Sequence, residues 1–151
     1  MKHARDHAQA IWHAGVNAVR ADRLIARSVR VAGSEFSVLE NTYSLEDVDR
    51  VCVVGAGKAA GYLAMELERV LQPIADRISL HGWINVPENC VEPTDYVHLH
   101  AGRPAGINEP RAEGVEGTQQ ILKLVSQLGP RDLCLCLLTV SYTHLTLPTK
   151  A

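Results

Sequence analysis

The sequence predicts an α/β protein with an open, parallel, Rossmann-like sheet in a three-layer arrangement, preceded by N-terminal helices. Apolar stretches typical of buried strands lie at residues 50–54, 78–86, 96–100 and 132–138, and helical patterns at 58–71 and 112–128 separate them. Strands that alternate with helices along the chain are typical of parallel sheets covered on both faces. We expect one such sheet with helices on both sides.

The N-terminal segment, from Ala4 to about Val31, predicts two amphipathic helices, with Asp22 as a start signal for the second. His3 and His7 would share a helix face, but one histidine pair near a terminus is typical of solvated surface, and we expect no metal site. The apolar positions are Ala8, Ile11, Trp12, Gly15, Val16 and Val19, then Leu24, Ile25, Ser28 and Val29.

Between these helices and the first strand of the sheet, residues 34–42 predict a short extended or irregular passage. Ser44-Leu-Glu-Asp47 resembles a helix-start box. We expect the strand at 132–138 to be covered on both faces, because its apolar character is continuous. In the helix before it, the residues expected to face inward are Val115, Ile121, Leu122, Leu124, Val125 and Leu128.

The composition favours a small-molecule partner. The chain has 151 residues, 46% of them hydrophobic. Its 15 basic and 17 acidic side chains nearly balance, so no electrostatic field of one sign would attract nucleic acid or a membrane. The start of the chain does not resemble a signal peptide, so we expect a cytoplasmic protein. Zinc ligation and disulfides are not expected, because no Cys-x-x-Cys spacing occurs among Cys52, Cys90, Cys134 and Cys136.

The most informative motif is the turn Gly55-Ala-Gly57-Lys58, which follows an apolar strand and begins a helix. Backbone N–H groups at such a turn point at one spot, as they do in sites that hold phosphate or carboxylate. The helix dipole disfavours a lysine here, so the position of Lys58 indicates a function in binding an anion. The alternative is a surface lysine on a tight turn.

Neither common nucleotide motif is complete at this turn. Gly55, Gly57 and Ala60 satisfy the loose dinucleotide pattern, but the acid that binds the ribose, expected at the end of the next strand, is not obvious: Asp76 precedes that strand and Glu88 follows it. A P-loop would need a hydroxyl residue directly after Lys58.

Five segments, all within roughly residues 8–138, together resemble the N-terminal part of the glycerate 2-kinase family that carries a MOFRL C-terminal domain. The resemblance implies an enzyme that uses ATP and Mg²⁺ to phosphorylate the 2-hydroxyl of D-glycerate, with Lys58 as the active-site lysine. Glycerate and a nucleotide are then the expected partners. The segments are residues 11–19, 51–60, 82–87, 100–104 with Asn108 and Glu109, and 113–122.

A second candidate region is the loop from Ala101 to Pro110. Arg103 and Asn108 are expected to reach an anionic ligand from beyond the carboxyl end of a strand, where open α/β sheets bind ligands. The family often has a histidine at the place of Arg103, and the alternative is a loop whose glycines and prolines only shape the chain. The predicted site thus comprises Lys58 as the catalytic residue, with Gly55, Gly57, Arg103 and Asn108 binding substrate or phosphate.

We expect the last residues of this sequence to be foreign to the natural protein. Residues 140–149 resemble the translation of a transposase adapter used in DNA library preparation, and Thr139 would then arise from a hybrid codon. We expect residues 1–138 to be the N-terminal part of a truncated, inactive glycerate kinase domain, and 139–151 to be a non-native tail. The alternative is a genuine β-segment, because Thr and Leu alternate there.

Two other functions remain open at this stage. One is an NAD(P)-dependent hydroxypyruvate reductase, against which the lysine in the turn and the missing ribose acid count. The other is a non-catalytic α/β fragment. Binding of NADH, or the absence of any nucleotide affinity, would favour one or the other.

Overall fold

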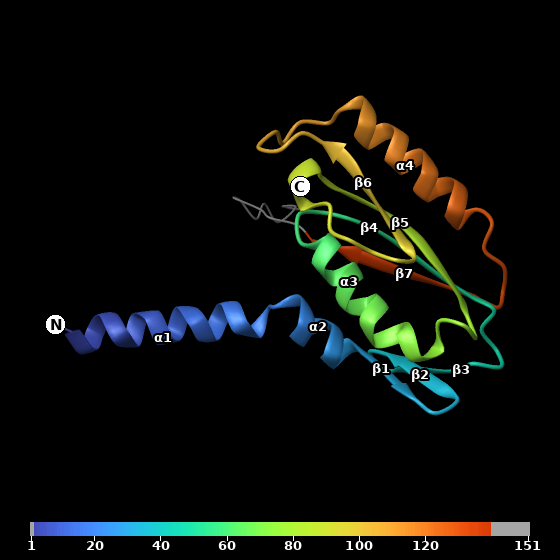
Figure 1. Cartoon of the computed structure of the whole chain (residues 1–151), viewed down its shortest axis with the longest axis horizontal. Helices are drawn as coiled ribbons and strands as arrows, with labels where there is room; N and C mark the ends of the chain where they lie inside the picture. Colours follow the sequence, from blue (N-terminus) through green and yellow to red (C-terminus); the bar gives the residue numbers. More distant parts are fainter. Residues whose placement is uncertain (1, 140–151) are drawn as a thin grey trace, which may run out of the picture.

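The computed structural model describes residues 2–139, and a four-stranded parallel sheet with the order β6-β5-β4-β7 forms its centre (Figure 1). The Rossmann-like α/β fold expected from the sequence is confirmed. The strands of this sheet are β4 (Arg50–Ala56), β5 (Ser79–Pro87), β6 (Val97–Arg103) and β7 (Asp132–Leu138). The helices are α1 (Lys2–Ala18), α2 (Ala21–Ser28), α3 (Ala60–Leu71) and α4 (Ala112–Val125), with short 3-10 turns η1 (Gln72–Ile74) and η2 (Glu88–Cys90).

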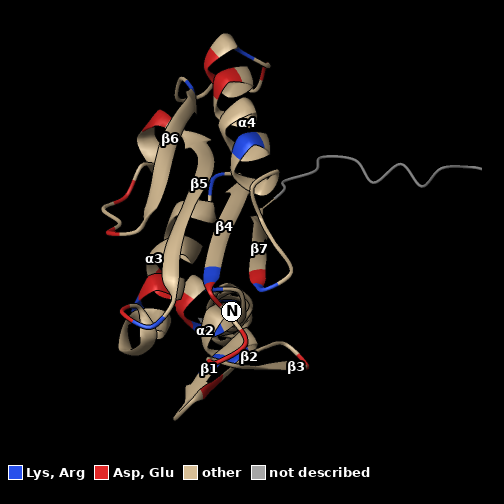
Figure 2. Ribbon diagram, turned by 90° about the vertical axis from the view of Figure 1, so that its right-hand side faces the viewer, with Lys and Arg blue, Asp and Glu red and all other residues tan. Residues whose placement is uncertain are grey.

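Helices α3 and α4 cover opposite faces of the sheet (Figures 1 and 2). The side chain of Leu99 lies against Gly61 of α3, whereas the ring of the next residue, His100, lies 2.8 Å from the Glu113 carbonyl of α4. Successive residues of a strand point to opposite faces, so the two helices lie on opposite sides. The core lies mainly on the α3 face, where Val51, Val53, Leu67, Leu71, Ile84, Val86 and Val97 are buried.

Charged residues begin β4 and β7, at the opposite end of the sheet from the turn that follows β4. Arg50 and Asp132 begin neighbouring strands, visible as blue and red segments at the lower ends of β4 and β7 (Figure 2). Arg50 Nε donates to Asp132 Oδ1 at 2.9 Å, and the Gly129 N–H donates to Asp132 Oδ2 at 2.6 Å. These bonds hold the amino ends of β4 and β7 together.

Glu68 connects α3 to the start of β6. Its carboxylate is buried, and it accepts the N–H groups of Asp95, Tyr96 and Val97 at 2.8, 2.9 and 2.7 Å. A buried charge is costly unless hydrogen bonds compensate it. Here three N–H donors compensate the charge of Glu68. The same hydrogen bonds fix the start of β6 relative to α3.

Three short strands, β1 (Val29–Ala32), β2 (Glu35–Val38) and β3 (Asn41–Ser44), form a separate antiparallel sheet. This corrects the sequence-based prediction of a helix up to about Val31, whereas the passage at 34–42, expected to be extended or irregular, is extended and contributes β2 and the start of β3. Val29 pairs with Val38, and Phe36, which is buried, packs on Tyr43 with ring centroids 5.5 Å apart. The helix start predicted at Ser44–Asp47 is also wrong, since these residues form the end of β3 and a turn.

Helix α4 lies in the predicted place, but its predicted inward face is partly wrong. Val115, Leu122 and Val125 are exposed, whereas Gly117 is buried against the sheet. A Cβ at Gly117 would overlap the Asn85 amide, so the helix approaches the sheet through its glycine. The close contact between the helix backbone and the sheet, rather than the number of apolar side chains, therefore determines which face of α4 is buried.

Apolar side chains are also exposed on α1 and on β7. On α1, which extends away from the rest of the molecule (Figure 1), Ile11 and Trp12 are 75% and 63% exposed. On β7, Cys134, Cys136 and Leu138 are exposed, so the prediction that both faces of this strand are covered is wrong. Among residues 2–139, no helix is both long and apolar enough to cross a bilayer. Apart from Thr139, the predicted tail lies outside the described residues.

Candidate anion-binding site

The turn from Gly55 to Lys58 links β4 to α3 and is held from both sides. The Gly57 N–H donates to the Asn85 carbonyl at the end of β5, at 3.0 Å, and the Thr139 N–H donates to the Ala56 carbonyl, also at 3.0 Å. Gly57 has φ +123°, a region that residues with a Cβ rarely adopt, and a Cβ there would overlap Thr139. This position of the turn therefore requires glycine.

The turn lies where the strand order reverses. After β4 the chain adds β5 and β6 on one side and then crosses over to place β7 on the other side of β4. Open α/β sheets bind ligands in the crevice outside the carboxyl ends of the strands at such a reversal. Lys58 follows the carboxyl end of β4 at this point.

The electrostatics of the turn favour an anion. Helix α3 has no acidic residue in its first turn, so no negative charge compensates its positive end there. Lys58 is exposed, and within the described part of the chain it forms no ion pair. The ammonium and the helix terminus therefore both offer positive potential at the reversal point.

Thr139 also contacts the turn, because its Oγ1 accepts the Ala59 N–H at 3.2 Å. Sequence reasoning excluded this residue as part of a foreign tail. A hydroxyl at the carboxyl end of β7 nonetheless contacts the start of α3.

Arg103 and Asn108 bind each other. The Arg103 guanidinium donates to the Ile107 carbonyl and, at 2.6 Å, to Asn108 Oδ1, which closes the loop after β6. Strand β5 separates this loop from the turn at Lys58. The structure thus groups the predicted residues into two sets: Gly55, Gly57 and Lys58 on one turn, and the Arg103–Asn108 pair on another.

Asn85, which sequence reasoning did not select, connects the turn to α4. Its carbonyl binds Gly57, and its side-chain amide lies 3.4 Å from both the Gly114 carbonyl and Thr118 Oγ1. Trp83 Nε1 donates to Asn85 Oδ1 at 3.2 Å. A polar residue at the carboxyl end of an apolar strand was the signal that could have identified it.

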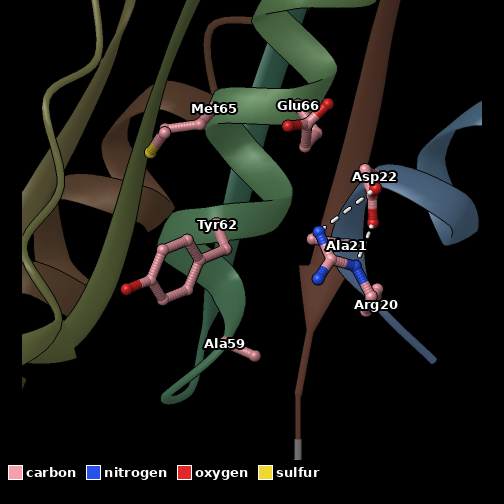
Figure 3. Close-up of a pocket in the computed structure, with 7 residues that line it drawn as sticks. All are labelled: Arg20, Ala21, Asp22, Ala59, Tyr62, Met65 and Glu66. Atoms are coloured by element: carbon pink, nitrogen blue, oxygen red, sulfur yellow. Dashed lines mark hydrogen bonds and ion pairs between the residues drawn. The ribbon is translucent and has the colours of Figure 1, made fainter. Parts of the chain in front are cut away.

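A cavity of about 320 Å³ lies beside the turn, between the start of α2 and the outer face of α3 (Figure 3). Asp22 accepts a hydrogen bond from Arg20 Nε at 3.1 Å, and this bond, together with the charges of Asp22 and Glu66, raises the pKa of Arg20. Sequence reasoning missed the cavity, although Tyr62 follows Lys58 by one helical turn. The lining residues are Arg20, Ala21, Asp22, Ala59, Tyr62, Met65 and Glu66.

The described residues form no cluster of metal-binding side chains. Among residues 2–139, no three His, Cys, Asp or Glu side chains come together in a way that could hold a metal ion. Mg²⁺ is held through carboxylate and phosphate oxygens, and the first turn of α3 has no acidic residue. We therefore assign no metal ligand and no step through a metal to this part of the chain.

Comparisons with known proteins agree with this fold. Residues 7–141 match a family described as a domain of unknown function, DUF4147. The crystal structure of the PH0495 protein from Pyrococcus horikoshii OT3 superposes with a TM-score of 0.70 at 16% sequence identity, over 88% of this chain. The match spans only 28% of the PH0495 chain, and at this identity it shows the fold alone. No curated protein matches the chain significantly.

Proposed function

Because the chain belongs to the DUF4147 family, we propose that it forms the lysine-bearing N-terminal part of an ATP-dependent glycerate 2-kinase. This family is the N-terminal domain of glycerate kinase-type proteins. The glycerate specificity, the use of ATP with Mg²⁺ and a cytoplasmic location are parts of the proposal. So are the extent of the domain, residues 1–138, and the foreign origin of residues 139–151.

The observation that carries the proposal is the position of Lys58. It lies on a glycine turn at the carboxyl end of β4, beside the uncompensated start of α3, where the strand order reverses. In phosphoryl transfer, catalysis consists mainly of positioning and of electrostatic stabilisation of the transferring group. An ammonium carried by an anion-binding turn suits that task.

In the proposed reaction, the 2-hydroxyl oxygen of glycerate bonds to the γ-phosphorus of ATP, and the bond from that phosphorus to the bridging oxygen breaks. ADP leaves, and the hydroxyl proton passes to solvent. Lys58 neutralises negative charge on the phosphoryl oxygens or on the glycerate carboxylate, and the backbone of the turn orients the same anion. Arg103 and Asn108 act only if a ligand displaces the hydrogen bond between them.

The test is binding of ATP to this chain by calorimetry, with Lys58→Ala as the variant. We expect loss of binding in Lys58→Ala and no change in Lys123→Ala, which removes another exposed lysine on α4. Equal affinity in both variants would remove Lys58 from the site. For the reaction itself, transfer to D-glycerate is measured by phosphorus NMR on the product of the source gene, resequenced past the codon for Leu138.

One observation bears on the reductase alternative. Glu88 directly follows β5, the place of the ribose-binding acid in dinucleotide sites, but its Oε1 accepts the Ala105 N–H at 3.0 Å. Fluorescence titration with NADH separates the two functions: tight binding that Glu88→Gln weakens would favour the reductase. A chain that binds neither NADH nor ATP would favour the non-catalytic alternative.

A further inference from the structure

We propose that the cavity between α2 and α3 binds the nucleoside part of the phosphate donor, with the base against the ring of Tyr62. This inference rests on the proposed function, since it assigns a place to the donor that the kinase reaction requires. It commits to a purine nucleoside triphosphate as the ligand.

The position of the cavity is the first argument. Its wall includes Ala59, the residue directly after Lys58, so it opens where a phosphate group held by the turn would end. The cavity formed around Arg50 and Asp132, by contrast, lies at the amino ends of the strands. Of these two cavities, the one lined by Ala59 is therefore the one next to the anion-binding turn.

The size of the cavity is the second argument. At about 320 Å³ it falls at the lower end of the range of small-molecule sites. A three-carbon hydroxy acid would leave most of this volume unfilled, whereas a nucleoside is of matching size. Glycerate by itself therefore does not account for the cavity.

The chemistry of the lining is the third argument. Tyr62 is 51% exposed. A hydrogen bond with Glu92 raises the pKa of the Tyr62 hydroxyl, so the hydroxyl already has a partner while the ring remains available as an aromatic surface. Nucleobases stack on such rings regardless of their hydrogen-bonding pattern. Figure 3 shows Tyr62 and Met65 on one side of α3 and the Arg20–Asp22 pair on the other, at the start of α2. The Glu66 carboxylate accepts a hydrogen bond from Arg69 Nε at 2.8 Å, so Arg20 and Asp22 are the charged groups of the wall that we assign to the ribose hydroxyls.

The experiment compares ATP, inorganic tripolyphosphate and adenosine as calorimetric ligands of the 151-residue chain at one ionic strength. We expect Tyr62→Ala to weaken ATP binding about tenfold, the contribution of one stacked base, and to leave tripolyphosphate binding within about twofold. Tyr62→Phe keeps the ring and is the matched control, with ATP affinity retained. Adenosine is expected to bind more weakly than ATP and to lose its binding in Tyr62→Ala.

The outcomes separate this inference from the proposed function. If ATP binds, Lys58→Ala abolishes that binding and Tyr62→Ala leaves it unchanged, the nucleoside lies elsewhere and the inference is overturned while the kinase proposal stands. Equal affinities for ATP and tripolyphosphate would overturn it in the same way. If neither polyphosphate binds the folded wild-type chain, both proposals fail together.

Discussion

The N–H of Gly57 donates to the carbonyl of Asn85 at 3.0 Å, so the end of β5 fixes the turn that carries Lys58. The same asparagine reaches the Gly114 carbonyl and Thr118 on α4 through its side chain. Two neighbouring strand ends and one helix therefore act on the conformation of a single glycine turn. The position of Lys58 therefore depends on residues of β5 and α4 as well as on its own turn.

Gly57→Ala is expected to destabilise the fold and to remove anion binding. The backbone at φ +123° disfavours a Cβ, and the added methyl would overlap Thr139, so the free energy of unfolding should fall by at least about 2 kcal/mol. Urea unfolding measures the loss. Gly106→Ala is the matched control, because Gly106 has φ +76° with open space around it, and it should cost only about 1 kcal/mol. Equal losses would show that the contact with Thr139 has no effect.

Asp132 is expected to make stability depend on pH in the acid range. The hydrogen bonds from Arg50, and then from the Gly129 N–H, lower the pKa of Asp132 below its value in the unfolded chain. Its contribution is therefore complete above the unfolded pKa and is lost as the pH falls through the folded pKa. We expect the stability difference between wild type and Asp132→Asn to be constant from about pH 5 to 7 and to shrink below about pH 4.

Thermal unfolding of both proteins across this pH range is the measurement. Asp76→Asn, at an exposed carboxylate, is the control. A difference between Asp132→Asn and wild type that persists undiminished at pH 2 would show that the Asp132 carboxylate does not stabilise the fold through its charge.

The sequence predicted the parallel sheet because its strands and helices carry strong periodic signals. Val51–Val54 is buried as expected, and the helix of α4 begins at Ala112, where it was predicted. The separate sheet β1-β2-β3 was missed because Val29 and Val31 fit a helical phase as well as a strand alternation. The turn at Gly33 resolves this ambiguity, and the Phe36–Tyr43 contact, which is tertiary, stabilises the result.

The candidate site was predictable only in part. Lys58 and its glycines lie on one local motif, which a sequence displays directly. Asn85 is 28 positions from Gly57 in the sequence, and only the parallel register of β4 and β5 brings them together. The cavity beside Ala59 depends on how α2 packs against α3, which no periodicity specifies. Long-range geometry thus accounts for what sequence reasoning missed.

The four cysteines are expected to differ sharply in reactivity. Burial raises the pKa of Cys52 to about 11, so at pH 8 roughly one molecule in a thousand carries the thiolate, and the side chain is also inaccessible. Cys136 is exposed and should react with iodoacetamide first. Peptide mapping after timed alkylation checks the order, and labelling in urea, where all four should react, is the control. Modification of native Cys52 as fast as Cys136 would contradict the buried position of β4.

Self-association through β7 is expected for the isolated chain. Within residues 2–139 this strand pairs with β4 alone, so its other edge has no strand partner among them, and its exposed face carries Cys134, Cys136 and Leu138. Apolar edge strands of this kind pair with other chains, and a lysine on the edge opposes such pairing. Cys136→Lys should therefore lower light scattering at micromolar concentration, whereas Cys136→Thr, which keeps an uncharged residue suited to strands, should not. A wild-type chain that stays monomeric and unfolds in one sharp transition would mean that this edge is protected in solution.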